Sequence, residues 1–92
     1  MAIVEIQLPS VLAAVTDGNM QFSVEAQTLR DALDVIVRQH PRLALHFFNE
    51  EGVFRPHVLC FLNETNTRWL DDLEVPLNGG DTLRFMQAVS GG

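Results

Sequence analysis

The residues best suited to chemistry stand at the end of the sequence, where Gly91 and Gly92 follow Ala88, Val89 and Ser90. Glycine has no Cβ, so its backbone can enter a channel that is too narrow for any other residue. The carboxylate of Gly92 is then a reactive group on a thin arm, open to adenylation, thiolation or coupling to an amine. The alternative interpretation is an ordinary glycine-rich terminus with no chemical role.

The other reactive side chains form no catalytic group in the sequence. Cys60 is the single cysteine, so it has no partner for an internal disulfide, and no cysteine–histidine spacing matches a metal site. Cys60 shares its strand phase with Val58 and Leu62, which predicts a buried structural thiol. His46 and His57 have no orienting partner and are expected at the surface. We therefore expect no catalytic residue, no metal and no cofactor.

The length and charge of the chain limit its domain organisation and its partners. The 92 residues suffice for one small domain, which we assign to residues 1–87, with 88–92 as a flexible tail. The net charge of −6 argues against a nucleic-acid partner and suits docking on a basic patch of another protein. No apolar run approaches the roughly 20 residues of a membrane-spanning helix, and the first residues lack the basic region of a signal peptide. The expected compartment is the reducing cytoplasm, without membrane contact.

Apolar periodicity predicts two strands followed by one helix in the first half of the chain. Residues 2–8 alternate between apolar and polar, and residues 20–25 repeat this pattern after a turn. Thr28 is a suitable N-cap for a helix over residues 29–40, with Asp31 in its first turn. The apolar stripe of this helix comprises Leu29, Ala32, Leu33, Ile36 and Val37.

The second half of the chain predicts one irregular stretch and three more strand segments. Residues 42–55 lack a clear period and are expected to form a short irregular segment tucked against the core. Strands are predicted over 57–62 and 82–87, with a short return over 67–69. Trp69, within that return, is expected to belong partly to the core.

This order of elements indicates an α+β fold of the β-grasp, or ubiquitin-like, type. One amphipathic helix has to cover one face of a mixed sheet of four or five strands. A chain that begins with a hairpin and crosses over through a helix can place its first and last strands side by side in the middle. The expected core comprises Leu29, Leu33, Ile36, Val58, Cys60, Leu62, Leu83 and Phe85.

Two segments resemble the MoaD/ThiS-type sulfur carrier proteins. Residues 55–63, Arg-Pro-His-Val-Leu-Cys-Phe-Leu-Asn, resemble the central strand and following turn of that family. Residues 76–92 resemble its end, where a Gly-Asp turn leads to a hydrophobic strand and an Ala-Val-x-Gly-Gly tail. The resemblance covers most of the chain and is weakest over 38–54. The additional segment around 41–56 makes the chain more similar to MoaD and CysO than to ThiS.

The resemblance implies a carrier that is not itself an enzyme and on which partner enzymes act. An ATP-dependent adenylyltransferase of the MoeB/ThiF type would adenylate Gly92, and sulfur would replace AMP to leave a terminal thiocarboxylate that donates sulfide. The implied partners are this activating enzyme, a tail-trimming metallopeptidase and a sulfur-accepting enzyme of cysteine, molybdopterin, thiamine or thiolated-metabolite biosynthesis. A β-grasp interaction module and a ubiquitin-like modifier of lysines stay open as alternatives.

A patch of side chains on the sheet is expected to dock the activating enzyme. Leu59 and Phe61 occupy the strand face opposite to Cys60, and Arg84 and Met86 are expected beside them on the last strand. Apolar side chains on a solvent face next to a reactive tail are unusual for a monomer, and the resemblance implies that partners use the same sheet face. We therefore predict a docking patch that consists of Leu59, Phe61, Arg84 and Met86.

Overall fold

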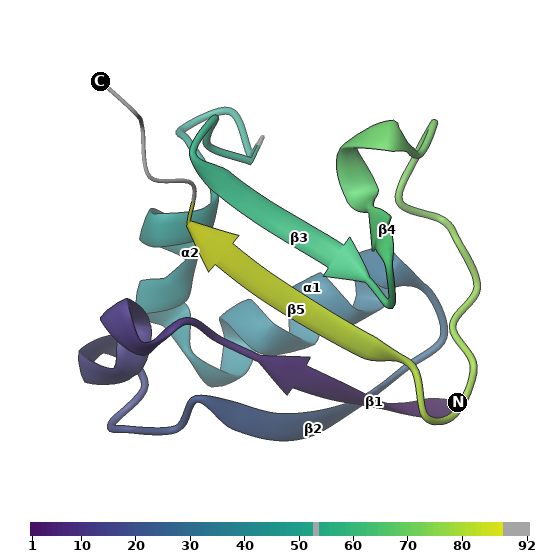
Figure 1. The fold of residues 1–92 in the computed structure, drawn as a ribbon, viewed down its shortest axis with the longest axis horizontal. Helices are drawn as coiled ribbons and strands as arrows, with labels where there is room; N and C mark the ends of the chain where they lie inside the picture. The colour runs from purple at the N-terminus through teal and green to yellow at the C-terminus, as the bar shows by residue number, and fades with distance from the viewer. Residues whose placement is uncertain (53, 88–92) are drawn as a thin grey trace.

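Five strands form one mixed sheet in the order β2-β1-β5-β3-β4 (Figure 1). The structure is a computed structural model in which residues 1–52 and 54–87 are described. The strands are β1 (Ala2–Gln7), β2 (Gln21–Ala26), β3 (Val58–Leu62), β4 (Thr65–Asn66) and β5 (Thr82–Gln87). The helical elements are α1 (Leu29–Gln39), α2 (Pro41–Phe47) and the 3-10 segments η1 (Ser10–Val15) and η2 (Thr67–Trp69). The predicted β-grasp arrangement is confirmed.

The first and last strands lie side by side at the centre of the sheet. β1 and β5 run parallel, with Glu5 opposite Thr82 and Gln7 opposite Arg84. β2 pairs with the other edge of β1, and β3 with the other edge of β5, both antiparallel. Two parallel neighbours need a crossover connection, and the segment that contains α1 supplies part of it.

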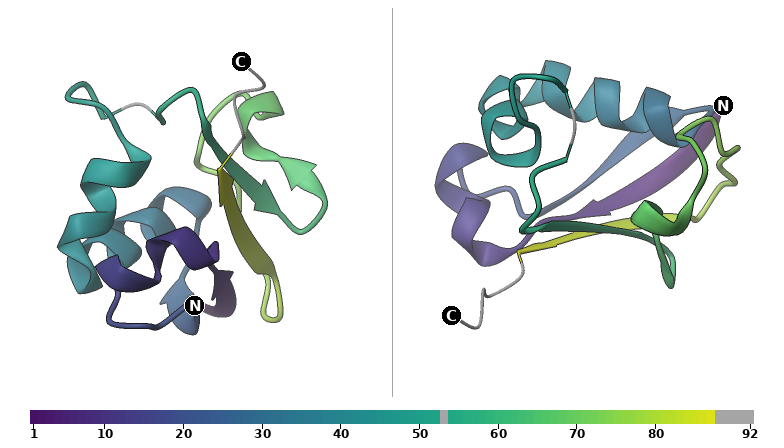
Figure 2. Two further views of the ribbon diagram at one scale, coloured as in Figure 1. Left: turned by 60° about the vertical axis from the view of Figure 1, so that its left-hand side comes forward. Right: turned by 90° about the horizontal axis from the view of Figure 1, so that it is seen from above.

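α1 covers one face of the sheet and leaves the opposite face open (Figure 2, right). The helix begins as predicted after Thr28, whose hydroxyl oxygen accepts a hydrogen bond from the backbone N–H of Asp31 at 3.2 Å. It ends at Gln39, because the residue before Pro41 avoids helical dihedral angles. Among the described residues, no helix is long and apolar enough to cross a membrane.

The prediction that residues 42–55 are irregular is wrong for the first half of that segment. Pro41 begins a second helix, α2, since proline at the first helical position gives up no intrahelical hydrogen bond. Leu43 and Phe47 are buried. The ring of Phe47 stacks on that of Phe85 in β5, with 4.4 Å between centroids. With seven residues, α2 is too short for its apolar period to be distinct in the sequence.

The core lies between the inner face of the sheet and the two helices. Seven of the eight predicted core residues are buried, and Leu62 is half-buried against them. The prediction for Trp69 is wrong, because 78% of this residue's surface is exposed. The buried residue of η2 is Thr67, so this short turn directs a different side chain inward from the one expected.

Candidate functional site at the open sheet face and the end of β5

The pairing of β3 with β5 brings the four residues of the docking patch together. Leu59 lies opposite Met86, and Phe61 lies opposite Arg84. Successive strand residues point to opposite faces. Since Cys60 of β3 and Phe85 of β5 are buried on the inner face, the four residues of the docking patch point toward the open face. Met86 is 43% exposed, Arg84 is exposed, and the two β3 residues are half-buried. The predicted neighbours are thus adjacent, and their role in docking stays a prediction.

Arg84 is the only cation among the strand residues of the described sheet. Its Nε donates a hydrogen bond to Oε1 of Gln7, its cross-strand neighbour in β1, at 3.3 Å. A guanidinium has five N–H donors, so this bond orients the side chain without exhausting its donors. Sequence reasoning missed Gln7. The available signal was its position on the outward phase of the first strand, next to the last strand in a β-grasp sheet.

β5 ends at Gln87 beside a shallow groove of about 330 Å³. The groove lies between β5 and the point where β1 gives way to Pro9, and Met86 of the docking patch contributes to its wall. The structure therefore describes the strand that leads to the tail, together with the patch and the groove beside that strand. The predicted tail residues Ala88, Val89, Ser90, Gly91 and Gly92 lie outside the described residues.

Cys60 is buried on the inner side of β3, beneath the docking patch. Burial raises the pKa of its thiol to about 12, and a side-chain hydrogen bond with Thr67 opposes this shift in part. The thiolate is the nucleophilic form of cysteine, so a thiol with this pKa is unreactive near neutral pH. The predicted burial of Cys60 is confirmed.

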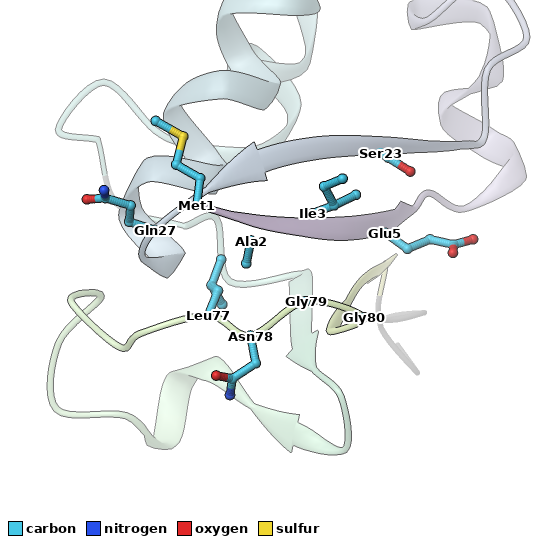
Figure 3. A pocket seen from close by; sticks show the side chains of 10 residues that line it. All are labelled: Met1, Ala2, Ile3, Glu5, Ser23, Gln27, Leu77, Asn78, Gly79 and Gly80. Carbon is cyan, nitrogen blue, oxygen red and sulfur yellow. The ribbon is translucent and has the colours of Figure 1, made fainter.

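The other polar groups and pockets of the described residues show no catalytic arrangement. His46 and His57 are exposed, as predicted. Within 1–52 and 54–87, no group of three or more His, Cys, Asp or Glu side chains has the geometry of a metal site. A pocket of about 720 Å³ opens beside β1 and the turn at Gly79 (Figure 3). The one ionisable side chain that lines it is Glu5, whose carboxylate accepts a hydrogen bond from the amide of Gln21.

Comparison with known sequences identifies relatives along almost the whole chain. Residues 6–92 match the model of the ThiS family. A protein of Archaeoglobus fulgidus that is named as a candidate sulfur carrier is 21% identical over 89 residues, which are 97% of this chain and 98% of that protein. The matched part includes most of the sheet, both helices and the Gly-Gly tail.

Solved structures with the same fold also match over nearly their full lengths. SAMP1 of Haloferax volcanii superposes with a TM-score of 0.81 at 30% identity, covering 99% of this chain and 100% of SAMP1. A chain of the BexX/CysO complex of Amycolatopsis orientalis gives a TM-score of 0.82 at 25% identity, with 97% and 99% coverage. CysO of Mycobacterium tuberculosis, at 19% identity and a TM-score of 0.82, shares the fold.

Proposed function

Because this chain belongs to the ThiS family, we propose that it is a sulfur carrier whose Gly92 carboxylate holds the sulfur. The observation that carries the proposal is the family match itself, which extends through residue 92 and so includes both glycines of the tail. A carrier supplies an acyl group and leaves the catalysis to its partners. The protein then acts as a co-substrate and needs no catalytic side chain of its own.

The proposed cycle has two chemical steps at Gly92. In the first, an activating enzyme of the MoeB/ThiF type joins the carboxylate oxygen to the α-phosphate of ATP, and pyrophosphate leaves. In the second, hydrosulfide or an equivalent sulfur nucleophile attacks the carbonyl carbon, a carbon–sulfur bond forms, and the carbon–oxygen bond to AMP breaks. Adenylation is needed because a carboxylate is a poor acyl donor. A sulfur-accepting biosynthetic enzyme then uses the thiocarboxylate.

The geometry around β5 supports this proposal. The docking patch and the end of β5 are contiguous, because Met86 belongs to the patch and Gln87 ends the strand. Residues 88–92, fully extended, span about 17 Å at 3.3–3.6 Å each. An enzyme seated on the patch can therefore hold its active site within reach of Gly92.

A ubiquitin-like modifier is the second candidate function, and one observation favours it. SAMP1 of Haloferax volcanii, 30% identical to this chain, is named a small archaeal modifier protein. Both functions begin with adenylation of the terminal glycine, and they differ in the nucleophile that follows. The sequence contains six arginines and no lysine, so its own side chains offer no amine for coupling. Any conjugate joined through a lysine side chain must therefore form on another protein.

Intact mass spectrometry separates the two functions. The protein is incubated with ATP, hydrosulfide and each MoeB/ThiF-type adenylyltransferase encoded in the same genome. A mass gain equal to the replacement of one oxygen by one sulfur identifies the carrier. Conjugates on added lysine-containing proteins identify the modifier, and an unchanged mass with every enzyme contradicts both.

Deletion of Gly92 tests the reacting group directly. We expect this deletion to abolish ATP–pyrophosphate exchange, because Gly92 is the one reacting site of the proposed cycle. We expect the same of Gly91→Val, because the proposed channel of the activating enzyme is too narrow for a Cβ. Both variants should keep the circular dichroism spectrum and melting temperature of the wild type. Full exchange activity in the Gly92 deletion would remove the basis of the carrier proposal.

A further inference from the structure

The single tryptophan of this protein points away from the fold. Trp69 exposes 78% of its surface, although tryptophan is a large side chain that folding normally removes from water. The described phenylalanines are buried or half-buried instead. Packing within the domain therefore does not explain this residue.

Trp69 stands on a rigid support, although the turn that carries it has only three residues. Thr67 is buried, and the side-chain oxygen of Asn66 caps the turn by accepting a hydrogen bond from the backbone N–H of Arg68 at 3.0 Å. One terminal nitrogen of Arg68 lies 2.7, 3.0 and 2.8 Å from three carbonyl oxygens, those of Arg55, Pro56 and Val58. These bonds fix the backbone of the turn that carries Trp69, so a partner that binds the indole does not have to order the turn, which favours the use of Trp69 as an anchor.

The support of Trp69 is tied to the part of the sheet where the tail begins. η2 follows β4 and lies beside β3 (Figure 1). Arg68 bonds to Val58, and Val58 lies opposite Gln87, the last residue of β5. On the other side, Asn66 lies opposite Phe61 of the docking patch. A protein that covers the docking patch and receives the tail is thus brought next to η2.

The chain on both sides of η2 carries exposed carboxylates. Glu64 precedes the turn and Asp71 follows it, and both carboxylates are exposed. The nearest cation in sequence, Arg68, directs its guanidinium at backbone carbonyls. A partner surface that complements this region offers an apolar pocket for the indole and basic side chains at the rim of that pocket.

We propose that Trp69 is an anchor for the activating enzyme and inserts into an apolar pocket of that enzyme with a rim of lysine or arginine side chains. This inference rests on the proposed function and adds a second contact to it, at the side of β3 away from β5. The docking patch supplies the broad contact on the open face, and Trp69 supplies a localised contact that fixes orientation. Tryptophan is among the residues that most often dominate the binding energy of interfaces.

Fluorine NMR tests the contact in the intact protein, with fluorotryptophan incorporated at the single tryptophan position. The probe is the unlabelled MoeB/ThiF-type adenylyltransferase that supports pyrophosphate exchange with the wild type, with ATP present. We expect the free protein to give one fluorine resonance, whose chemical shift differs between water and heavy water because the ring is exposed to solvent. In the complex this resonance moves, and the difference between water and heavy water disappears because the ring is covered. An unchanged resonance while exchange proceeds overturns the anchor and leaves the proposed function standing.

Substitutions measure how much Trp69 contributes to binding of the activating enzyme. Trp69→Ala should raise the protein concentration for half-maximal pyrophosphate exchange at least about tenfold, and Trp69→Phe should raise it less. Leu45→Ala is the matched control, because Leu45 is 71% exposed on α2 and should leave exchange unchanged. Equal effects of Trp69→Ala and Leu45→Ala, at an unchanged melting temperature, overturn the proposal.

The charge of the partner is tested separately. Glu64→Gln combined with Asp71→Asn should weaken exchange and flatten its salt dependence, whereas Asp34→Asn, an exposed carboxylate on α1, should not. Salt dependence equal to that of the wild type contradicts the basic rim.

A fluorine resonance that shifts with the concentration of the protein alone would identify a second copy as the occupant and overturn the proposal. Absence of exchange with every adenylyltransferase overturns the proposed function, and this inference with it.

Discussion

At the scale of single residues, alkaline titration of the side chains in this chain is confined to Cys60. The sequence has no tyrosine and no lysine, the other side-chain types that ordinarily titrate in this range. Burial raises the pKa of the Cys60 thiol from its ordinary value of 9.0 to about 12. An alkaline effect on stability that arises from a side chain can therefore be attributed to the Cys60 thiol.

The free energy of unfolding should fall as the pH rises from about 9 toward 12. The thiol ionises first in the unfolded chain, so the stabilising effect of the neutral form is complete below pH 9.0 and is lost as the pH approaches 12. We expect a loss of a few kcal/mol, since each pKa unit corresponds to 1.36 kcal/mol. Urea unfolding at stepped pH values measures this. The Cys60→Ala variant should lack the decline, and an equal decline in that variant would assign it to another group.

At the scale of elements, α2 supports the strand that carries the tail. Phe47 of α2 and Phe85 of β5 stack with nearly parallel rings, 7° between their planes. Phe48 then pairs with Phe54 across the loop that returns to β3. The segment that looked like an insertion in the sequence is thus a second layer behind β5.

Truncation of Phe47 should therefore destabilise the protein strongly. We expect Phe47→Ala to cost about 3–5 kcal/mol, the usual range for a buried phenylalanine, because both the ring contact and the packing behind Phe85 are lost. The midpoint of urea unfolding measures the effect. Leu45→Ala, on the exposed side of the same helix, should stay within about 0.5 kcal/mol of the wild type. A small effect of Phe47→Ala would mean that α2 contributes little to the core.

Elements long enough to show a repeating apolar pattern could be predicted from the sequence, and short elements could not. The alternation in β1 and the stripe from Leu29 to Ile36 identified the central strand and the main helix. Strand phase also assigned Leu59 and Met86 to one face before their pairing was known. α2 and η2 span too few residues to show a period. The helix α2 was therefore missed, and Trp69 was expected inward in η2, where Thr67 is the buried residue.

At the scale of the whole molecule, the two faces of the sheet are covered differently, and we expect them to have different tasks. The inner face, with Val58 and Phe85, packs against the helices and holds the fold together. No helix covers the open face (Figure 2, right), which carries Phe61 of β3 and Met86 of β5. Substitutions on the inner face should therefore change the stability of the fold, and substitutions on the open face should change the binding of a partner.

Phe61→Glu should weaken binding to the activating enzyme and leave the melting temperature within a few degrees of the wild type, because Phe61 is half-exposed on the open face. Leu33→Ala should do the reverse. It removes a core leucine at a cost of about 2–5 kcal/mol, and the folded fraction should still bind. Calorimetric melting and binding titrations give both quantities. Loss of the fold in Phe61→Glu would contradict the division of tasks between the faces.

The central position of β5 has a consequence for the order of events during synthesis. Glu5 lies opposite Thr82, so the sheet pairs a residue near the start of the chain with one that the ribosome adds much later. Contacts of such long sequence separation form late, because the whole intervening chain must be ordered to close them. A nascent chain that has not reached residue 82 lacks the middle of its sheet and half of the docking patch. The strand that completes folding is also the strand that leads to the glycines, so, under the proposed function, Gly92 is offered to an enzyme only by a domain that has already folded.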